Sequence, residues 1–243
     1  MHEIERTVSH SQCGPDGRMK LYAAADMMMD CCQFQECGER ALRDYFLAHD
    51  LAVFLVSIQY DVLRMPRLNE TVRTRVVIYD CQSIYGFRRI TIKDADGRLC
   101  MIANGVGAFF NFRERRAVRL PAEEIRTLVI DPAEDEMECL PRRIPLPDGP
   151  STALEAVRVG ASRLDVNRHL TSTEYLAIAQ DRLPEDVVFD RVRIEYKMQA
   201  KLGDLLVPRL HRLPSGAAVV RMENEDGALH AVLEFSKRNA APG

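Results

Sequence analysis

The 243-residue sequence has no tryptophan, no hydrophobic run near the ~20 residues that a membrane-spanning helix needs, and no large basic block. The formal net charge of −3 and the missing basic block make general nucleic-acid binding a poor fit. The first 17 residues are polar and mixed in charge, which is typical neither of a secretory signal nor of a transit peptide. Because aliphatic residues are abundant and the net charge is low, we expect a folded globular protein.

A C-x-x-C pair is also absent, although the chain has seven cysteines at irregular spacing. The spacing does not favour a structural zinc site, and we expect no metal and no cofactor. Several cysteines lie within apolar stretches, where a free thiol behaves as a small hydrophobic side chain. We therefore expect a reduced protein in the cytoplasm.

The first half of the chain is predicted to form one long helix followed by antiparallel strands. In residues 22–46, apolar side chains recur at helical spacing, and Gly38 is expected to bend or cap the helix. The segments that follow are rich in Val, Ile, Phe and Tyr, and Asp96-Gly97 is a strong hairpin signal. The predicted strands are Leu51–Val62, Thr71–Tyr79, Ser83–Lys93 and Leu99–Phe110.

Residues 126–150 break this pattern with five prolines, an acidic run at Glu134–Glu138 and the pair Arg142-Arg143. Proline removes a backbone donor and restricts the residue before it, so this composition predicts a linker. Ordered linkers of this length are uncommon, and we expect this one to lie against a domain surface.

The second half repeats the order of the first. Val157–Ala161 is a short strand-like piece, and Thr171–Leu183 is predicted to be a helix that Pro184 stops. Asp226-Gly227 is again a turn signal between the last two strands. The predicted strands are Phe189–Gln199, Asp204–Leu213, Ala217–Asn224 and Leu229–Lys237.

Short matches between the halves indicate a tandem duplication of one α+β unit. Asp96-Gly97-Arg98-Leu99 matches Asp226-Gly227-Ala228-Leu229, and Leu68–Val72 resembles Leu202–Leu206. The pair Asp16 and Leu21 parallels Asp165 and Leu170 at an offset of 149 residues. We predict an N-terminal unit at 1–125, a linker at 126–150 and a C-terminal unit at 151–243, with the two sheets paired edge to edge.

The most specific segment is Ser162–Leu170, which contains Asp165, Asn167 and His169 directly before the second predicted helix. If the segment is extended, alternation directs all three side chains to one side. Thr171 and Glu174 form the sequence pattern of a capping box, and the helix N-terminus offers N–H donors to an oxyanion. A carboxylate, an amide and an imidazole at such a place suit hydrolysis of an ester or thioester by water.

The same residue types are also common before helices simply because they cap and turn. The first half offers a contrast, since Asp16-Gly17-Arg18-Met19-Lys20 keeps the aspartate but has neither the amide nor the imidazole. Because only the second half has all three polar residues, we expect a single active copy of the repeated unit.

At these residues the chain resembles the acyl-acyl-carrier-protein thioesterases, a double-hotdog family. Asp165, Asn167, His169 and Tyr175 occupy the places of the family's Asp-x-Asn-x-His segment and following tyrosine. Further segments that look like the family's patterns are Ile194-Glu195-Tyr196-Lys197, Gly203-Asp204, Arg64-Met65-Pro66 and Phe87-Arg88-Arg89. The resemblance covers about residues 5–125 and 155–237, and implies a tandem (double) hotdog, each unit a long helix packed on an antiparallel sheet.

The resemblance implies a thioester hydrolase that releases free fatty acid from acyl carrier protein, with Asp165, Asn167 and His169 as catalytic residues. The chain departs from the family at Gln199, where many members have a glutamate implicated in activating water. An amide cannot act as a general base but can hold a water, so Asp165 or His169 must take the proton. Ala200 stands where plant members often have cysteine, which gives no support to a cysteine nucleophile.

Other residues carry weaker signals. Met27 and Met28 are expected either to line an acyl-chain pocket, as the resemblance implies, or to belong to the core. Thr171 and Tyr175 are assigned to substrate binding, Glu195 to a polar role near the site, and His211 and His230 to structure. The arginines at 113, 115, 116 and 119 either steer an acidic carrier protein or form a solvated face.

Two other functions stay open at this point. One is a hotdog dehydratase or hydratase that acts on acyl thioesters, and the other is a protein that binds acyl thioesters without cleaving them. The expected partner is an acyl carrier protein that bears a fatty acyl-phosphopantetheine. The sequence leaves open monomer or homodimer, the acyl-chain length, and carrier protein or coenzyme A thioester as substrate.

Overall fold

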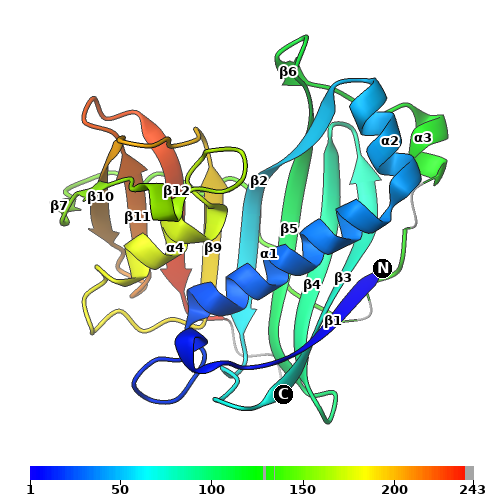
Figure 1. Ribbon diagram of the computed structural model, residues 1–243. Helices are drawn as coiled ribbons and strands as arrows, with labels where there is room; N and C mark the ends of the chain where they lie inside the picture. Colours follow the sequence, from blue (N-terminus) through cyan, green and yellow to red (C-terminus); the bar gives the residue numbers. More distant parts are fainter. Residues whose placement is uncertain (128–129, 134, 239–243) are drawn as a thin grey trace. The chain divides into compact units, whose positions relative to one another are not determined.

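The computed structural model describes residues 1–127, 130–133 and 135–238, and the chain divides into two compact units (Figure 1). Unit 1 comprises Met1–Val56 and Val62–Cys139, and unit 2 comprises Ser57–Asp61 and Leu140–Gly243. Strand β2 (Leu51–Val62) therefore contributes residues to both units.

Unit 1 is an antiparallel sheet with a long helix, α1 (Leu21–Gly38), across it (Figure 1). Strand β3 (Thr71–Gln82) pairs with β1 (His2–Thr7) on one side and with β4 (Tyr85–Asp94) on the other. Strand β5 (Leu99–Asn111) follows β4, and its far end pairs with the short strand β6 (Arg116–Ala117). The remaining elements of unit 1 are the 3-10 turn η1 (His10–Gln12), α2 (Arg40–Ala48) and α3 (Ala122–Thr127).

The predicted helix over 22–46 is two helices, so its continuity was wrong. The chain leaves the helical conformation at Glu39, with φ −84° and ψ 74°, directly after Gly38. The bend expected at Gly38 is therefore confirmed. Strand β1 was missed because its sequence, HEIERT, is polar and mostly exposed and so gives little hydrophobic signal.

Four strands of unit 1 were predicted close to their true bounds, because they are rich in β-branched and aromatic residues, which favour strands. The turn at Asp96-Gly97 is confirmed: Gly97 has φ +81°, and its N–H donates to the Asp94 carbonyl at 3.0 Å. β3 runs three residues further than predicted, past an irregularity between Ile78 and Asp80.

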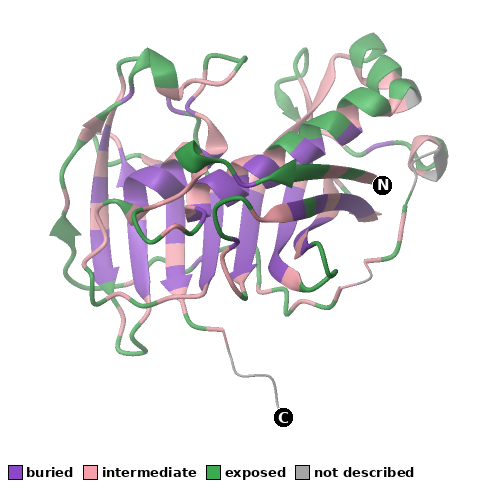
Figure 2. Ribbon diagram, turned by 60° about the horizontal axis from the view of Figure 1, so that its bottom comes forward, coloured by how far each residue is buried: buried purple, intermediate pink, exposed green. Residues whose placement is uncertain are grey.

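Unit 2 repeats this plan with a shorter helix, α4 (Ser172–Gln180), whose Thr173 and residues 175–179 are buried (Figures 1 and 2). Its strands run in the order β2, β9 (Arg191–Tyr196), β12 (Leu229–Ser236), β11 (Ala218–Glu223) and β10 (Leu205–Arg212), all antiparallel. The short strands β7 (Thr152–Ala153) and β8 (Val157–Arg158) both pair with β10, and the 3-10 turn η2 covers Ala161–Arg163.

Helix α4 ends at Gln180, three residues before the predicted end, because residues 181–183 close as a turn in which the Leu183 N–H donates to the Gln180 carbonyl. The predicted capping box is also wrong. The Thr171 hydroxyl donates to the Arg163 carbonyl at 3.2 Å, and the Glu174 carboxylate pairs with the Arg163 guanidinium. Arg163 thus engages both side chains that the sequence pattern assigns to the cap.

The predicted linker packs on both units, which confirms that it lies against domain surfaces. In unit 1, Arg89 donates to the Asp135 carbonyl at 2.8 Å. In unit 2, Ile144 is 2% exposed, and its N–H donates to the buried Glu195 carboxylate at 3.0 Å. The first residue of the predicted acidic run, Glu134, lies outside the described residues.

All seven cysteines are free thiols. Among the described residues, every helix is too short or too polar to cross a bilayer.

Candidate active site

The segment Asp165–His169 of unit 2 is a tight turn. The Asp165 N–H donates to the His169 carbonyl at 2.8 Å, the Arg168 N–H donates to the Asp165 carbonyl at 3.0 Å, and Arg168 has φ +63°. The expected extended conformation is therefore wrong, and alternation does not set the directions of the three side chains. The turn forms because an aspartate side chain can bond the backbone ahead of it.

The Asp165 carboxylate holds this turn. Its Oδ1 accepts the N–H of Asn167 at 2.8 Å and the N–H of His169 at 3.0 Å. Asp165 is thus bonded to the main chain of His169 rather than to the imidazole ring. Asp165 and His169 are half-buried, whereas Asn167 is exposed beside Val166, which is 97% exposed.

A second segment, Met198–Lys201, lies against the turn. His169 forms a β-bridge with Lys201, and the Leu170 N–H donates to the Ala200 carbonyl at 2.8 Å. The structure therefore brings Gln199 into the segment that neighbours His169, and leaves the Gln199 side chain exposed. Gln199 and His169 are 30 residues apart in sequence, and this pairing is what joins them.

Tyr175 of α4 fixes the Met198–Lys201 segment through its hydroxyl group. Its hydroxyl accepts the N–H of the buried Ala200 at 3.0 Å and lies 3.5 Å from the Met198 carbonyl. Burial raises the pKa of Tyr175 to about 12, so the phenol stays protonated at neutral pH. The Tyr196 ring packs edge-on against Tyr175 at 5.8 Å, and its hydroxyl donates to the Ser172 carbonyl at 3.0 Å.

His230, which its place on a predicted strand assigned to structure, also positions the Met198–Lys201 segment. It is 2% exposed, and its Nδ1 lies 3.2 Å from the Met198 carbonyl. Its own carbonyl accepts the N–H groups of Lys197 and Met198. Sequence placed His230 on a strand and gave no sign of this long-range contact.

The N-terminus of α4 adjoins the turn and has no side-chain cap, because Thr171 bonds to Arg163 instead. Uncapped helix N-termini carry N–H donors and the positive end of the helix dipole. A half-buried imidazole beside such a terminus can take a proton from a water molecule, and an exposed side-chain amide can hold that water. The free N–H groups of the terminus can polarise a carbonyl.

Met27 and Met28 lie on α1 in unit 1 and are 3% and 0% exposed. Met27 borders a surface hollow of about 200 Å³. The other residues around the hollow are Arg6, Ser11, Gln12, Tyr22, Ala23, Asp26 and Asp30. The structure therefore places both methionines in the core of unit 1.

Glu195 is 3% exposed and binds Lys197 at 2.6 Å in addition to the linker N–H, which gives it a structural role.

Unit 1 has the same turn without the same side chains. The Gly14 N–H donates to the Arg18 carbonyl at 2.8 Å, and the Met19 N–H donates to the Pro66 carbonyl at 2.8 Å. These bonds match those of Asp165 and Leu170 at an offset of 151 residues, not 149, so the predicted register was wrong by two. Gly14 therefore corresponds to Asp165, Asp16 to Asn167 and Arg18 to His169.

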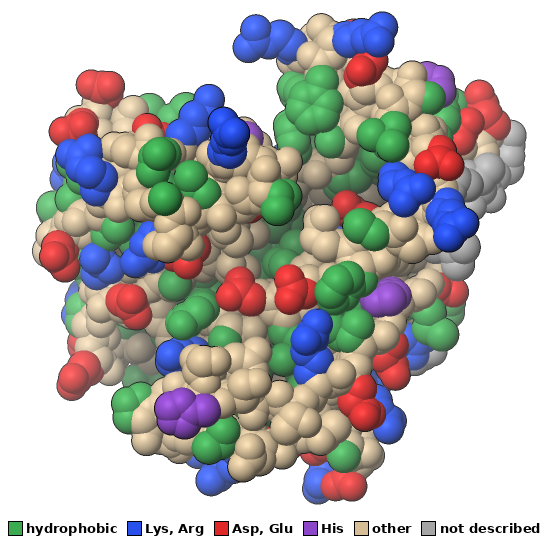
Figure 3. Space-filling model, in the orientation of Figure 1, with side chains coloured by type: hydrophobic (Ala, Val, Ile, Leu, Met, Phe, Trp, Pro, Cys, Tyr) green, Lys and Arg blue, Asp and Glu red, His purple; other side chains and the backbone are tan. Residues whose placement is uncertain are grey.

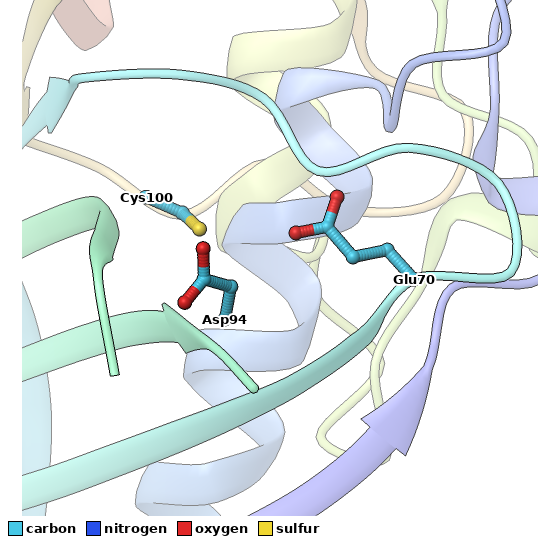
Figure 4. A group of neighbouring side chains, drawn as sticks. All are labelled: Glu70, Asp94 and Cys100. Atoms are coloured by element: carbon cyan, nitrogen blue, oxygen red, sulfur yellow. The ribbon is translucent and has the colours of Figure 1, made fainter. Parts of the chain in front are cut away.

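Unit 1 also has a cluster of possible metal ligands, in which ligand atoms of the half-buried Glu70 and the buried Asp94 and Cys100 lie within 4.8 Å of one another (Figure 4). Arg64 occupies the carboxylates, at 2.5 Å from Glu70 and 2.6 Å from Asp94. Burial raises the pKa of the Cys100 thiol to about 11, which keeps it a poor metal ligand. The cluster is therefore an ion-pair network rather than a site for a metal.

Comparison with known proteins gives a family and a fold. The family model described as the acyl-ACP thioesterase N-terminal domain matches residues 2–128. No curated protein sequence matches the chain. An acyl-ACP thioesterase from Bacteroides thetaiotaomicron has a similar structure, with a TM-score of 0.82 at 15% identity over 96% of each chain. A 12:0-ACP thioesterase from Umbellularia californica has a TM-score of 0.81 at 17% identity, over 96% of this chain and 95% of that one.

At these identities the structural likeness establishes the fold, a hotdog-type thioesterase fold of antiparallel strands with few helices. The family model covers more than half of the chain. The chain belongs to the acyl-ACP thioesterase family and is a thioester hydrolase.

Proposed function

We propose that this hydrolase cleaves fatty acyl-acyl carrier protein to free fatty acid and carrier protein, and that it is a tandem hotdog. The observation that carries the substrate assignment is the match of residues 2–128 to the acyl-ACP thioesterase domain. The shared turn geometry of the two units supports a duplication with an N-terminal hotdog at 1–125, a linker at 126–150 and a C-terminal hotdog at 151–243. The free cysteines are consistent with a cytoplasmic protein.

The reaction takes place at the Asp165–His169 turn of unit 2. The thioester carbonyl oxygen lies at the uncapped N-terminus of α4, where main-chain N–H groups stabilise the developing oxyanion. Asn167 or Gln199 holds the attacking water through its amide, and both are exposed to receive it.

His169 takes the proton as the water oxygen attacks the carbonyl carbon. The tetrahedral intermediate then collapses, the carbon–sulfur bond breaks, and the phosphopantetheine thiolate leaves and takes up the proton. Asp165 acts as a positioning residue, because its carboxylate sets the main chain of Asn167 and His169. Thr171 and Tyr175 contribute by fixing the start of α4 and the Met198–Lys201 segment.

Met27 and Met28 remain proposed contacts of the acyl chain. Their burial on α1 supports an apolar environment in unit 1, which is what an acyl chain requires.

A thiol-release assay with acyl-carrier-protein and acyl-coenzyme A thioesters of varied chain length tests the proposal. We expect free thiol and free fatty acid from the carrier-protein thioester, with the higher kcat/KM on that substrate. A change in absorbance at an enoyl bond without thiol release would instead indicate a dehydratase or hydratase. Equal or better hydrolysis of coenzyme A thioesters would contradict the carrier-protein assignment.

A further inference from the structure

Three phenylalanines form an aromatic patch on unit 1, at the end of the sheet where β5 turns into β6. The ring centroids of Phe54 and Phe110 are 4.9 Å apart, those of Phe54 and Phe112 are 5.8 Å apart, and those of Phe110 and Phe112 are 5.9 Å apart. Phe112 is 54% exposed and the other two are half-buried.

This aromatic patch is not a continuation of the core under the helices. Phe110 lies in β5 and Phe112 follows directly after the end of that strand. Phe109, the neighbour of Phe110 in β5, points to the other face, where its ring packs edge-on against Phe46 of α2 at 6.1 Å. The helix side of the sheet is thus satisfied by Phe109. The aromatic patch, by contrast, exposes aromatic surface to solvent, which marks an interaction site more often than chance exposure does.

Four exposed arginines follow Phe112 within seven residues of the chain, in the β5–β6 turn, in β6 and just after it, at positions 113, 115, 116 and 119. Arg113 pairs with Asp50 and Arg116 with Glu114. Arg115 and Arg119 form no ion pair with any described residue, so the hairpin carries an excess of positive charge. In Figure 3, hydrophobic and basic side chains gather over the β6 end of unit 1.

The aromatic patch is held in place by main-chain bonds. The Phe112 N–H donates to the Asp50 carbonyl at 2.9 Å, and the Val118 N–H donates to the Phe109 carbonyl at 2.8 Å. The Asn111 side chain donates to the His49 carbonyl at 3.1 Å. A surface that is already ordered loses little conformational entropy on binding.

We propose that the aromatic patch and its arginines are the docking surface for the acyl carrier protein, an inference that rests on the proposed function. Acyl carrier proteins are acidic, and Arg115 and Arg119 supply the complementary charge. Phe112 supplies the apolar anchor that arginine-rimmed interfaces use at their centre. Charge complementarity distinguishes this partner from a second copy of a chain whose net charge is −3.

The test separates docking from chemistry by using two substrates. The variant Arg115→Glu/Arg119→Glu should lose at least about tenfold in kcat/KM on the acyl-carrier-protein thioester, because reversed charge slows association. Its kcat/KM on the matching coenzyme A thioester should stay within about twofold, because that substrate does not need the surface. The control Arg18→Glu/Arg67→Glu makes the same change in charge at another exposed part of unit 1 and should affect neither substrate strongly.

A second variant, Phe112→Ser, probes the apolar anchor without changing charge. We expect weaker binding of holo-carrier protein, measured by titration with no acyl group and therefore without turnover. Phe112 lies at an exposed hairpin tip, so this variant should keep the wild-type circular dichroism and coenzyme A activity.

The outcomes separate the two proposals. If wild-type enzyme cleaves the carrier-protein thioester and both variants match it, the docking surface is wrong and the proposed function stands. If wild-type enzyme fails to cleave it, the proposed function is wrong and the docking proposal loses its partner. The docking proposal is also overturned if the variants keep carrier binding but lose binding to anionic lipid vesicles, or if Phe112→Ser changes only the oligomeric state.

Discussion

The two turns that precede α1 and α4 have the same backbone and different side chains. Gly14–Arg18 in unit 1 and Asp165–His169 in unit 2 close with matching main-chain bonds, and each lies against a second segment of its own unit through Arg18 and Arg67 or His169 and Lys201. The same main-chain frame with different side chains on it is the pattern that the proposed duplication predicts. The comparison locates the difference between the units in side-chain chemistry rather than in fold.

The second segments differ in the same way. Pro66 in unit 1 corresponds to Ala200 in unit 2, and Ala24 corresponds to Tyr175. Pro66 has no N–H to satisfy, whereas the N–H of the buried Ala200 donates to the Tyr175 hydroxyl. Unit 1 therefore needs no phenol at this position, and unit 2 does.

Arg64, Asp94 and Cys100 of unit 1 correspond to Met198, Asn224 and His230 of unit 2, since their main-chain bonds match at offsets of 134 and 130 residues. In unit 1 these positions carry a network of charges, with Arg64 bonded to Glu70 and Asp94. In unit 2 the same positions carry a thioether, an amide and an imidazole, from Met198, Asn224 and His230. In unit 1 the charged side chains at these positions are thus tied up in ion pairs. In unit 2 the equivalent segment carries the exposed Gln199.

The largest effect is expected from the pair of variants His169→Ala and Arg18→Ala, which alter equivalent positions. His169→Ala should lower kcat by about 10²–10⁴, the usual contribution of a general base. Arg18→Ala should leave kcat within about twofold. Thiol release from the carrier-protein thioester measures both. Equal losses of kcat in the two variants would contradict the claim that only unit 2 is catalytic.

A smaller effect is expected on stability when the Tyr175 hydroxyl is removed. Tyr175→Phe leaves the buried Ala200 N–H without a partner, which should cost about 1–3 kcal/mol in urea unfolding. Adding Ala200→Pro copies the unit 1 solution and removes that donor, so the double variant should recover part of the loss. A double variant less stable by the sum of both single changes would show that the two segments are not equivalent.

Acid unfolding should distinguish the ion-pair network from its neutral counterpart. Burial acts to raise the pKa of Asp94, but hydrogen bonds from the Arg98 main chain and Arg64 outweigh it and lower the pKa to about 2. A carboxylate with a depressed pKa stabilises the fold above its unfolded value of 3.8, and the contribution is lost as the pH falls toward 2.

The variant Asp94→Asn imitates Asn224 of unit 2 and removes this titration. We expect its urea midpoint to start lower at neutral pH and to fall less steeply between about pH 4 and pH 2 than that of the wild type. Parallel curves for the two proteins would assign the acid sensitivity to other carboxylates.

The smallest effect is expected from Gln199→Glu, which restores the acid that many family members carry. A carboxylate beside His169 should add an acidic limb to the pH profile of kcat and change kcat at neutral pH by less than about tenfold. An unchanged profile would place residue 199 away from the attacking water.

Strands β2 to β5 and β9 to β12 could be predicted because their hydrophobic patterns record burial directly. The polar strand β1 could not, since it pairs with β3 through main-chain bonds and an exposed Glu5–Arg73 ion pair, which give no hydrophobic pattern. The break after Gly38 could be predicted from the glycine. That the chain then starts a second helix, α2, instead of continuing α1 after a bend could not be predicted from the sequence pattern.

The candidate site was predicted as a set of residues but not as a geometry. Asp165, Asn167 and His169 are adjacent in sequence, and spacing suggested an extended strand where Asp165 instead closes a turn. The capping box failed because Arg163, eight residues before Thr171, takes both of its side chains. Sequence patterns do not include such long-range competitors, and the contact of His230 with Met198 was missed for the same reason.

The central claim is that the imidazole of His169 takes the proton of the attacking water in unit 2. The most direct measurement is single-turnover thiol release by His169→Ala with and without added imidazole. We predict slow release that free imidazole restores in proportion to its concentration, while Arg18→Ala neither loses activity nor responds. Wild-type release by His169→Ala would contradict the assignment of the base and with it the division of labour between the two units.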